Sequence, residues 1–212
     1  PDASPDCVGV DVAMAQTPGG DRTALAPRTG ATIGGLVTRP GSQTPDGQSV
    51  LALLTAAGWA GSPCNVDAIG IGKSVIDTAA MVPMPLVRPV VVSNATDWVD
   101  PKFPWVRFAN TRAAVWWNLR TLLDPEAGPE DTRLAVPPDP GLLSDLTAPR
   151  YCLRLGGIAV ESKDDIRKRI GRSTDVGDAV GLACWLPPAG PESYAADYGA
   201  TPFDRLPGDI FR

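Results

Sequence analysis

The sequence of 212 residues predicts an α/β protein in which helices flank a mixed β-sheet. Three short β-rich runs near the N-terminus predict an antiparallel meander. Strand-like and helix-like segments then alternate, which predicts further parallel strands with helices on both faces of the sheet. Apolar residues make up 43% of the chain, enough to build a substantial core.

The N-terminal part predicts the meander. The run CVGVDVA (residues 7–13) is β-rich and carries Asp11 near its end. The segments TALAPRTG and ATIGGLVT predict two more strands, with a turn at Thr29–Gly30. The apolar neighbours of Asp11 indicate that its strand lies near the centre of the sheet.

The next segments predict the rest of the sheet. Residues 44–59 have apolar positions at helical spacing, with Asp46 as N-cap and Gly58 as the stop. A strand, a helix and a second strand follow, in CNVDAIGIG, KSVIDTAAMV and PLVRPVVVS. The two strands bring the expected sheet to five: an antiparallel meander followed by parallel strands.

The second half of the chain predicts mostly helices. The longest helical pattern covers residues 105–123, and PDPGLLSDL predicts a short helix or turn. RYCLRLGGIAVES predicts an additional hairpin with Gly156–Gly157 at its tip. KDDIRKRI and TDVGDAVGLACWL predict the last two helices. We expect one domain over residues 1–186, and a Pro/Gly-rich extension over 187–212 that packs on it or trails from it.

The composition excludes several kinds of site. The chain has no histidine, which removes His-ligated zinc, the Ser-His-Asp triad and the Cys-His pair. The formal net charge of -5 argues against a sequence-independent DNA coat, but allows an enzyme that meets DNA through a local basic patch. No apolar run reaches transmembrane length and no signal peptide opens the chain, so we expect a cytosolic protein without a membrane partner.

The four cysteines are Cys7, Cys64, Cys152 and Cys184. They form no CxxC pair, and each lies in an apolar run. We therefore expect buried free thiols in a reducing compartment.

Residues 67–74, DAIGIGKS, resemble the end of a phosphate-binding P-loop. Asp67 replaces the first glycine of that motif, and its carboxylate would face the phosphates that the loop must bind. We therefore predict no nucleotide site. We expect the glycines to let the backbone turn sharply, so that Asp67 projects from the end of its strand.

Four aspartates remain for chemistry. A buried Asp11 without a partner would be costly, which indicates a functional role. The alternatives are that it pairs with a buried arginine or lies exposed at the strand end. Asp67 has an alternative role as a turn or N-cap residue. Asp175 and Asp178 share one flank at the start of the last helix, with Ser173 as the expected N-cap. The helix dipole accounts for Asp175 better than for Asp178, which we place in the second turn.

Strand ends and a helix start from distant parts of the chain can meet at one point. Several carboxylates at that point repel each other unless a hard cation compensates them. Ligands that are all oxygen suit Mg²⁺ or Mn²⁺, and two such ions can hydrolyse a phosphodiester. The aspartates therefore indicate a two-metal nuclease site.

Four blocks, in this order, carry a family resemblance: VGVDVA…GGDRTALAPRTG, VDAIGIGKSVID, FANTRAAVWWNLR and ESKDDIRKRIGRSTDVGDAVGLA. Over residues 7–186 the chain closely resembles the C-terminal nuclease domain of the large terminase subunit of tailed bacteriophages. The resemblance implies an RNase H-like fold of the RuvC kind. It also implies cleavage of concatemeric viral DNA at the start and end of packaging into the procapsid.

The resemblance also implies roles for the carboxylates. By motif position Asp11, Asp67 and Asp178 are the catalytic residues and ligands of two Mg²⁺ or Mn²⁺ ions, and Asp175 is an accessory ligand. Asp21 and Glu161 are lesser candidates. The chain departs from the family at Thr174 and Gly177, where Pro and a basic residue are usual, and in a longer loop with Pro18 between Asp11 and Asp21.

The family further implies partners and a location. Double-stranded DNA is the substrate, and an upstream ATPase domain, the small terminase subunit and the portal are partners in the full protein. The chain lacks a complete P-loop, so no nucleotide is expected in this domain. The implied location is the cytoplasm of the infected bacterial host, transiently at the procapsid portal, and not the virion.

Basic residues before the last helix predict DNA backbone contacts. These are Lys163, Arg167, Lys168, Arg169 and Arg172, with Lys73 and Arg22 as further candidates. Ion pairs within the helix, with Asp164 and Asp165, are the alternative. Of the adjacent Trp116 and Trp117, one is expected to pack inward, and Arg112 to pair with a buried acid.

Two other functions stay open. One is a different RNase H-like nuclease, such as a junction resolvase or a transposase core. The other is a module that docks DNA or the portal without cutting.

Overall fold

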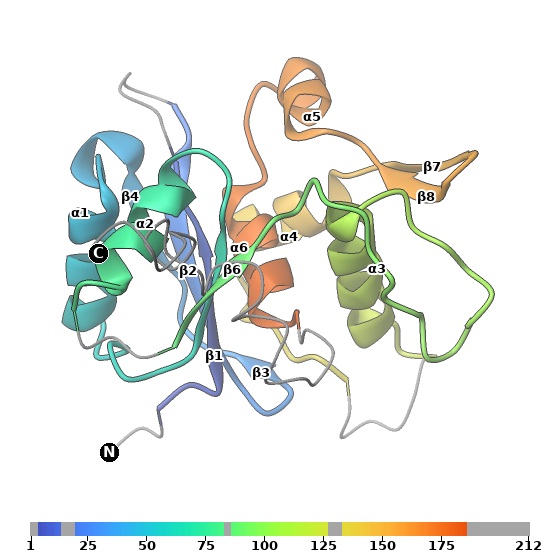
Figure 1. Ribbon diagram of the computed structural model, residues 1–212. Coiled ribbons are helices and arrows are strands. Elements are labelled where there is room, and N and C mark those ends of the chain that lie inside the picture. Colours follow the sequence, from blue (N-terminus) through green and yellow to red (C-terminus); the bar gives the residue numbers. More distant parts are fainter. Residues whose placement is uncertain (1–3, 14–19, 83–85, 127–132, 186–212) are drawn as a thin grey trace, which may run out of the picture.

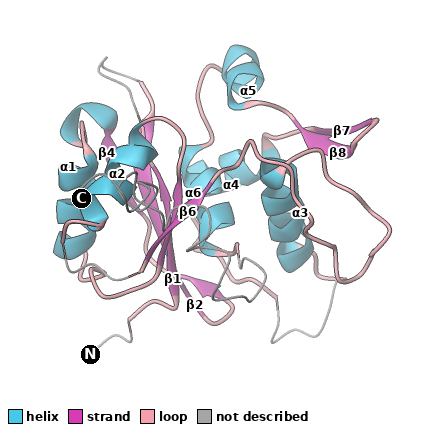
Figure 2. Cartoon of the chain, viewed as in Figure 1, coloured by secondary structure: helices cyan, strands magenta, loops and turns pink. Residues whose placement is uncertain are grey.

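A mixed sheet lies between two layers of helices (Figure 1). The computed structural model describes residues 4–13, 20–82, 86–126 and 133–185. In these residues the main sheet has six strands, in the order β3-β2-β1-β5-β6, with β4 also paired to β2. A separate two-stranded hairpin, β7–β8, projects beside α3 and α5 (Figure 2).

The strands are β1 (Cys7–Asp11), β2 (Arg22–Thr29), β3 (Thr32–Ile33), β4 (Val37–Pro40), β5 (Cys64–Asp67), β6 (Val87–Val90), β7 (Tyr151–Arg154) and β8 (Gly157–Val160). The α-helices are α1 (Gly47–Ala56), α2 (Ile71–Ala79), α3 (Thr111–Leu123), α4 (Pro140–Thr147), α5 (Lys163–Ile170) and α6 (Asp175–Ala183). A short 3₁₀ turn, Gly41–Gln43, joins β4 to α1.

The central strand β1 is antiparallel to β2 and parallel to β5. Side chains alternate between the two faces of a strand. Val8 and Val10 face the layer of α1 and α2, where they are fully buried. Gly9 and Asp11 therefore face the opposite layer, which contains α6. A Cβ at Gly9 would lie 1.9 Å from the carbonyl oxygen of Ala179, so this glycine lets α6 lie directly against β1.

The third strand of the predicted meander is divided in two. β3 pairs with β2 through Thr32 and Ile33, and β4 pairs with β2 from Val37 onward. The break between the two strands covers residues 34–36. The α/β class and the mixed sheet flanked by helices are confirmed, but the sheet has six strands rather than the expected five because of this break.

Local signals located the start of α1 correctly, but not the start of α3. Asp46 is the N-cap of α1, and its side chain and that of Ser49 form a reciprocal capping box. The long helix α3 begins only at Thr111, because Asn110 provides its N-cap. The prediction of a start at residue 105 was wrong.

Two boundaries in the last third also differ from expectation. The hairpin turns at Leu155–Gly156, since Arg154 pairs with Gly157. α6 has Thr174 rather than Ser173 as its N-cap, so Asp178 lies at the end of the first turn, not in the second.

Three of the four cysteines are buried and free as expected, but Cys152 is exposed on β7. The segment around it was read as buried because it is apolar, yet the hairpin leaves that strand in solvent. No helix in the described ranges is long and apolar enough to cross a membrane. The predicted extension 187–212 and the loop with Pro18 lie outside the described residues.

Candidate metal centre

Asp11 and Asp67 end two adjacent parallel strands. Gly9 pairs in register with Asn65, and Val10 with Val66, so the two aspartates follow at the same edge of the sheet. On β5, Val66 faces the α1–α2 layer, which leaves Asn65 and Asp67 on the α6 face. The Asn65 amide donates to the carbonyl oxygens of Leu182 and Trp185, at 2.8 and 2.6 Å, and so fixes the end of α6 against this edge.

Asp178 reaches the same place from α6. It is only 6% exposed, and its carboxylate has three fixed hydrogen-bond donors. Arg112 Nη1 and Trp116 Nε1 of α3 donate to its Oδ1 at 2.5 and 3.0 Å. The hydroxyl of Thr174 donates to its Oδ2 at 2.9 Å. The expected pairing of Arg112 with a buried acid is thus found, and Asp178 is the acid.

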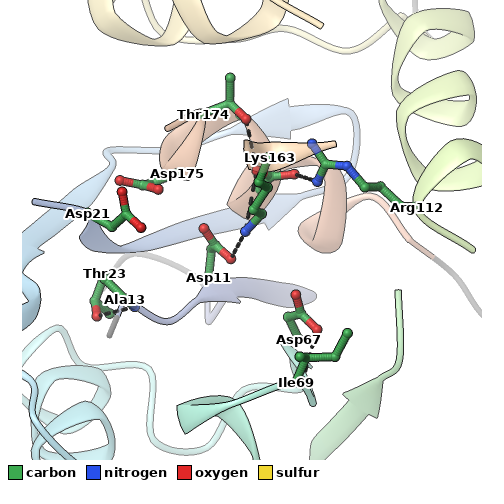
Figure 3. A network of polar contacts seen from close by, with 12 residues as sticks. Asp11, Ala13, Asp21, Thr23, Asp67, Ile69, Arg112, Lys163, Thr174 and Asp175 are labelled. Carbon is green, nitrogen blue, oxygen red and sulfur yellow. Dashed lines mark hydrogen bonds and ion pairs between the residues drawn. The ribbon is translucent and has the colours of Figure 1, made fainter. Parts of the chain in front are cut away.

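A single cavity joins the three predicted catalytic carboxylates. Its lining includes Asp11, Asp67 and Asp178, together with Lys163 and Arg112. Figure 3 shows Asp11, Asp67, Arg112 and Lys163 converging from β1, β5, α3 and α5, and Asp178 comes from α6. The residues come from five separate elements, so only the folded chain assembles them.

Lys163 places a positive charge between two of the carboxylates. Its Nζ donates to Asp11 Oδ1 at 2.7 Å and lies 3.5 Å from Asp178 Oδ2 (Figure 3). The basic pattern of α5 had predicted a DNA contact for this lysine. The structure places its amine in the acidic cavity instead, at the first residue of α5.

The pKa shifts of the three aspartates follow from their burial and from the ion pairs with Lys163 and Arg112. Burial raises the pKa of Asp11 to about 7, although Lys163 opposes the shift. Burial also raises the pKa of Asp67. Burial acts in the same direction on Asp178, but Arg112 and Lys163 outweigh it and hold the pKa of that carboxyl below its usual value. Near neutral pH, Asp178 is therefore a fixed anion and Asp11 is close to its midpoint.

The donor set suits a hard divalent cation. Lys163 Nζ is already a cation held by two buried carboxylates, and the third carboxylate lines the same cavity. In the described part of the chain no three Asp, Glu or Cys side chains lie close enough together to hold a metal ion. The carboxylate oxygens are the ligand type that such an ion prefers, and in this structure they surround the Lys163 ammonium group.

The accessory acids lie outside this cavity. Asp175 Oδ2 accepts a hydrogen bond from the backbone N–H of Arg22 at 2.8 Å. Burial raises the pKa of Asp175, and Asp21 lies beside it (Figure 3). Glu161 accepts two hydrogen bonds from Arg169, at 3.0 and 2.5 Å. None of these three residues lines the cavity, so their assignment as metal ligands stays a prediction.

The GKS segment has the structural role that the sequence indicated. Gly70 has φ +64°, and a Cβ at Gly72 would lie 1.6 Å from the carbonyl oxygen of Asp67. These glycines let α2 start directly over the end of β5, while Asp67 projects from the strand end. Lys73 pairs with Asp77 of its own helix at 2.6 Å.

Most basic residues predicted to contact DNA have partners inside the chain. Arg167 pairs with Asp21, Arg169 with Glu161 and Arg172 with Asp145. The Arg22 guanidinium donates to the Thr38 hydroxyl at 2.5 Å. Lys168 has only a 3.8 Å contact with Asp165 and is 79% exposed. A role of these residues in DNA binding stays a prediction.

Three polar residues of the site were missed. Thr174 was noted only as a departure from the family pattern, and Trp116 was assigned to the core. Asp145 is 2% exposed and binds the start of α6, but in sequence it is one acid within a short helix. No spacing rule links residues this far apart, so only the fold reveals these contacts.

Solved structures with the same fold include phage terminase nucleases. The nuclease domain of the large terminase subunit gp2 of bacterial virus Sf6 has a TM-score of 0.63 and 17% identity, covering 85% of this chain and 88% of that one. This chain has the fold of a large-terminase nuclease domain. A lysine-to-alanine variant of the Sf6 domain with manganese has a TM-score of 0.64 and 14% identity over the same shares of the chains.

A third terminase nuclease, from the thermophilic phage G20c and with bound magnesium, has a TM-score of 0.58 and 17% identity, covering 87% of this chain and 82% of that one. No protein-family model and no curated protein sequence matches the chain. At this level of identity the likeness concerns the fold, which confirms the RNase H-like expectation. The chemistry rests on this chain's own residues.

Proposed function

We propose that the chain is a divalent-metal-dependent endodeoxyribonuclease that cleaves concatemeric viral DNA during genome packaging. The observation that carries the proposal is the cavity in which Asp11, Asp67 and Asp178 meet around a positive charge. The shared fold supports it, as do the terminase nucleases that were solved with manganese and magnesium.

In this proposal Asp11, Asp67 and Asp178 would hold Mg²⁺ or Mn²⁺ ions, and the bound ions would supply activation of water and charge stabilisation for hydrolysis of a phosphodiester. Arg112, Trp116 and Thr174 hold Asp178 ionised and in one orientation. Lys163 balances the charge of Asp11 and Asp178 whenever the ions are not bound.

The wider role extends the same proposal. Double-stranded DNA is the substrate, and α5 with its basic residues lies beside the cavity, since Lys163 is its first residue. An ATPase domain, the small terminase subunit and the portal are the partners proposed for the full protein. The proposed location is the cytoplasm of the infected host, with transient attachment at the portal.

The test is a nicking assay on supercoiled plasmid with Mn²⁺. Wild type should nick the plasmid, and Asp11→Ala and Asp178→Ala should each reduce the rate at least about a hundredfold, because each removes a ligand of the reacting centre. Asp77→Ala is the matched control, since Asp77 is an exposed aspartate that pairs with Lys73. Wild type without activity, or active-site variants as fast as wild type, would refute the nuclease function.

The same assay separates the alternatives. A junction resolvase would cut a four-way junction far faster than linear or supercoiled duplex. A docking module would bind DNA without cutting it under any metal. Preference for duplex over junction, together with metal-dependent cutting, supports the terminase function.

A further inference from the structure

The N-terminus of α6 lacks a cap from its own N-cap side chain. Thr174 occupies the N-cap position, yet its side chain makes no capping hydrogen bond. Its hydroxyl instead donates to Asp178 Oδ2 at 2.9 Å. The first backbone N–H groups of a helix have no partner within the helix, and leaving them unpaired in a buried place is costly.

Asp145 of α4 supplies the missing acceptor. Its Oδ2 accepts hydrogen bonds from the backbone N–H groups of Val176 and Gly177, at 3.0 and 3.1 Å. The residue is only 2% exposed, so this carboxylate caps α6 from a different helix. A negative charge at this end also interacts favourably with the helix dipole.

The cap is itself held in place. Arg172 Nη1 donates to Asp145 Oδ1 and to the carbonyl oxygen of Ser173, and Nη2 donates to Ser144 Oγ at 2.6 Å. A Cβ at Gly177 would lie 2.9 Å from Asp145 Cβ and 2.9 Å from Trp116 Cη2. α3, α4 and α6 therefore pack closely at this glycine, and Asp145 has no space to move away from the start of α6.

We propose that Asp145 is a positioning residue for Asp178, an inference that rests on the proposed nuclease function. Asp178 directly follows Gly177, so the carboxylate that fixes the N–H of Gly177 also fixes the turn from which Asp178 projects. Because Asp145 caps the helix, the Thr174 hydroxyl is free to orient the Asp178 carboxylate. Loss of Asp145 would draw Thr174 back to the helix end and loosen Asp178 from Arg112 and Trp116.

The test compares Asp145→Ala and Asp145→Asn with Asp139→Ala. Asp139 is the N-cap of the same helix α4 and accepts from the N–H of Leu142 at 2.8 Å, so its loss weakens α4 without removing the cap of α6. One readout is the NMR resonance of the Trp116 indole N–H, which donates to Asp178 Oδ1. The other is kcat and KM for plasmid nicking with Mn²⁺, at a temperature where every variant is folded.

We expect Asp145→Ala to move the Trp116 indole resonance toward its position in Asp178→Asn. We expect kcat to fall about 10- to 100-fold with KM little changed, since a misplaced catalytic group slows the chemical step. Asp145→Asn keeps one acceptor oxygen and should recover part of both signals, and it replaces the alanine variant if that does not fold. Asp139→Ala should leave both at wild-type values.

The outcomes separate this inference from the nuclease function. A wild type that does not cut refutes the nuclease function, and the Trp116 resonance alone then decides whether Asp145 positions Asp178. An unmoved resonance in folded Asp145 variants overturns the inference. So does wild-type kcat in those variants, or an equal loss of kcat in an Asp139→Ala protein of matched thermal stability.

Discussion

The Nζ of Lys163 lies 2.7 Å from Oδ1 of Asp11, although 152 positions separate the two residues in the chain. The same amine lies 3.5 Å from Asp178 Oδ2. A buried carboxylate without a compensating charge is strongly destabilising. The lysine therefore compensates the charge of both carboxylates, and under the proposed function a metal ion would compete with it for the same place.

Lys163→Met should destabilise the metal-free protein and strengthen its response to metal. Without the amine, two buried carboxylates lose a partner, which typically costs about 3 kcal/mol. Mn²⁺ should then raise Tm more in the variant than in wild type, because the ion no longer displaces a bound cation. Thermal unfolding with and without Mn²⁺ measures both effects.

Lys168→Met is the control for this substitution, since Lys168 is 79% exposed on the same helix. It should match wild type in both conditions. An equal Mn²⁺ effect on Tm in Lys163→Met and wild type would show that the ion does not compete with this amine.

Asp11→Asn should remove a pH dependence of stability. Burial raises the pKa of Asp11 from 3.8 to about 7, so between these values the folded state keeps a proton that the unfolded state releases. The free energy of unfolding therefore falls as pH rises from about 4 to 7, by at most about 4 kcal/mol for this one group. In chelator, the free energy of unfolding of the variant, measured with urea, should vary less over this range.

Three other carboxyls bear on that measurement. The pKa values of Asp67 and Asp175 are also raised, so they add a slope of the same sign, while the lowered pKa of Asp178 gives the opposite sign. Asp77→Asn, on the surface, should leave the whole profile unchanged. An Asp11→Asn profile as steep as that of wild type would contradict the raised pKa.

Gly9→Ala should disrupt the contact between β1 and α6. The added Cβ would lie 1.9 Å from the carbonyl oxygen of Ala179 and 2.4 Å from the backbone nitrogen of Ala183. Because both neighbours are backbone atoms, α6 must move, at a cost of about 3 kcal/mol or more. The same movement would carry Asp178 away from Asp11, so nicking should fall with stability.

Gly35→Ala is the matched control, since a Cβ there meets nothing within 4 Å. Urea unfolding should place it within about 0.5 kcal/mol of wild type. If Gly9→Ala were as stable as Gly35→Ala, the close approach of β1 and α6 would be wrong.

The carboxylates of the site could be predicted because each carries a local signal. Asp11 and Asp67 interrupt or end apolar strands, and adjacent parallel strands bring such residues to one edge. Asp178 stands beside the apolar stripe of α6. These signals depend on residues close in sequence, and the structure places all three side chains around one cavity.

The partners of these residues could not be predicted in the same way. Lys163 and Arg167 look alike within the basic helix, yet one enters the cavity and the other pairs with Asp21. The difference comes from how α5 lies against the sheet. Asp145 gave no signal because its hydrogen-bond donors, two backbone N–H groups of α6 and the Arg172 guanidinium, lie far from it in the sequence.

Most basic side chains of α5 are already paired with acidic residues of this chain. Arg167 and Arg169 are bound to Asp21 and Glu161, and these contacts would have to open before either could reach a phosphate. Lys168 points into solvent with one long contact to Asp165. Among the described basic residues of this helix, Lys168 is the best placed for a phosphate contact.

Lys168→Ala should therefore weaken DNA binding and lower its salt dependence. Each phosphate contact that is lost reduces the slope of log K against log salt by about 0.9 for duplex DNA. Arg169→Ala should change the slope less, because Glu161 already neutralises that arginine. Fluorescence anisotropy of a labelled duplex, titrated in chelator at several salt concentrations, measures both slopes. The reverse result, with Arg169→Ala lowering the slope and Lys168→Ala leaving it unchanged, would mean that the pair with Glu161 opens on DNA.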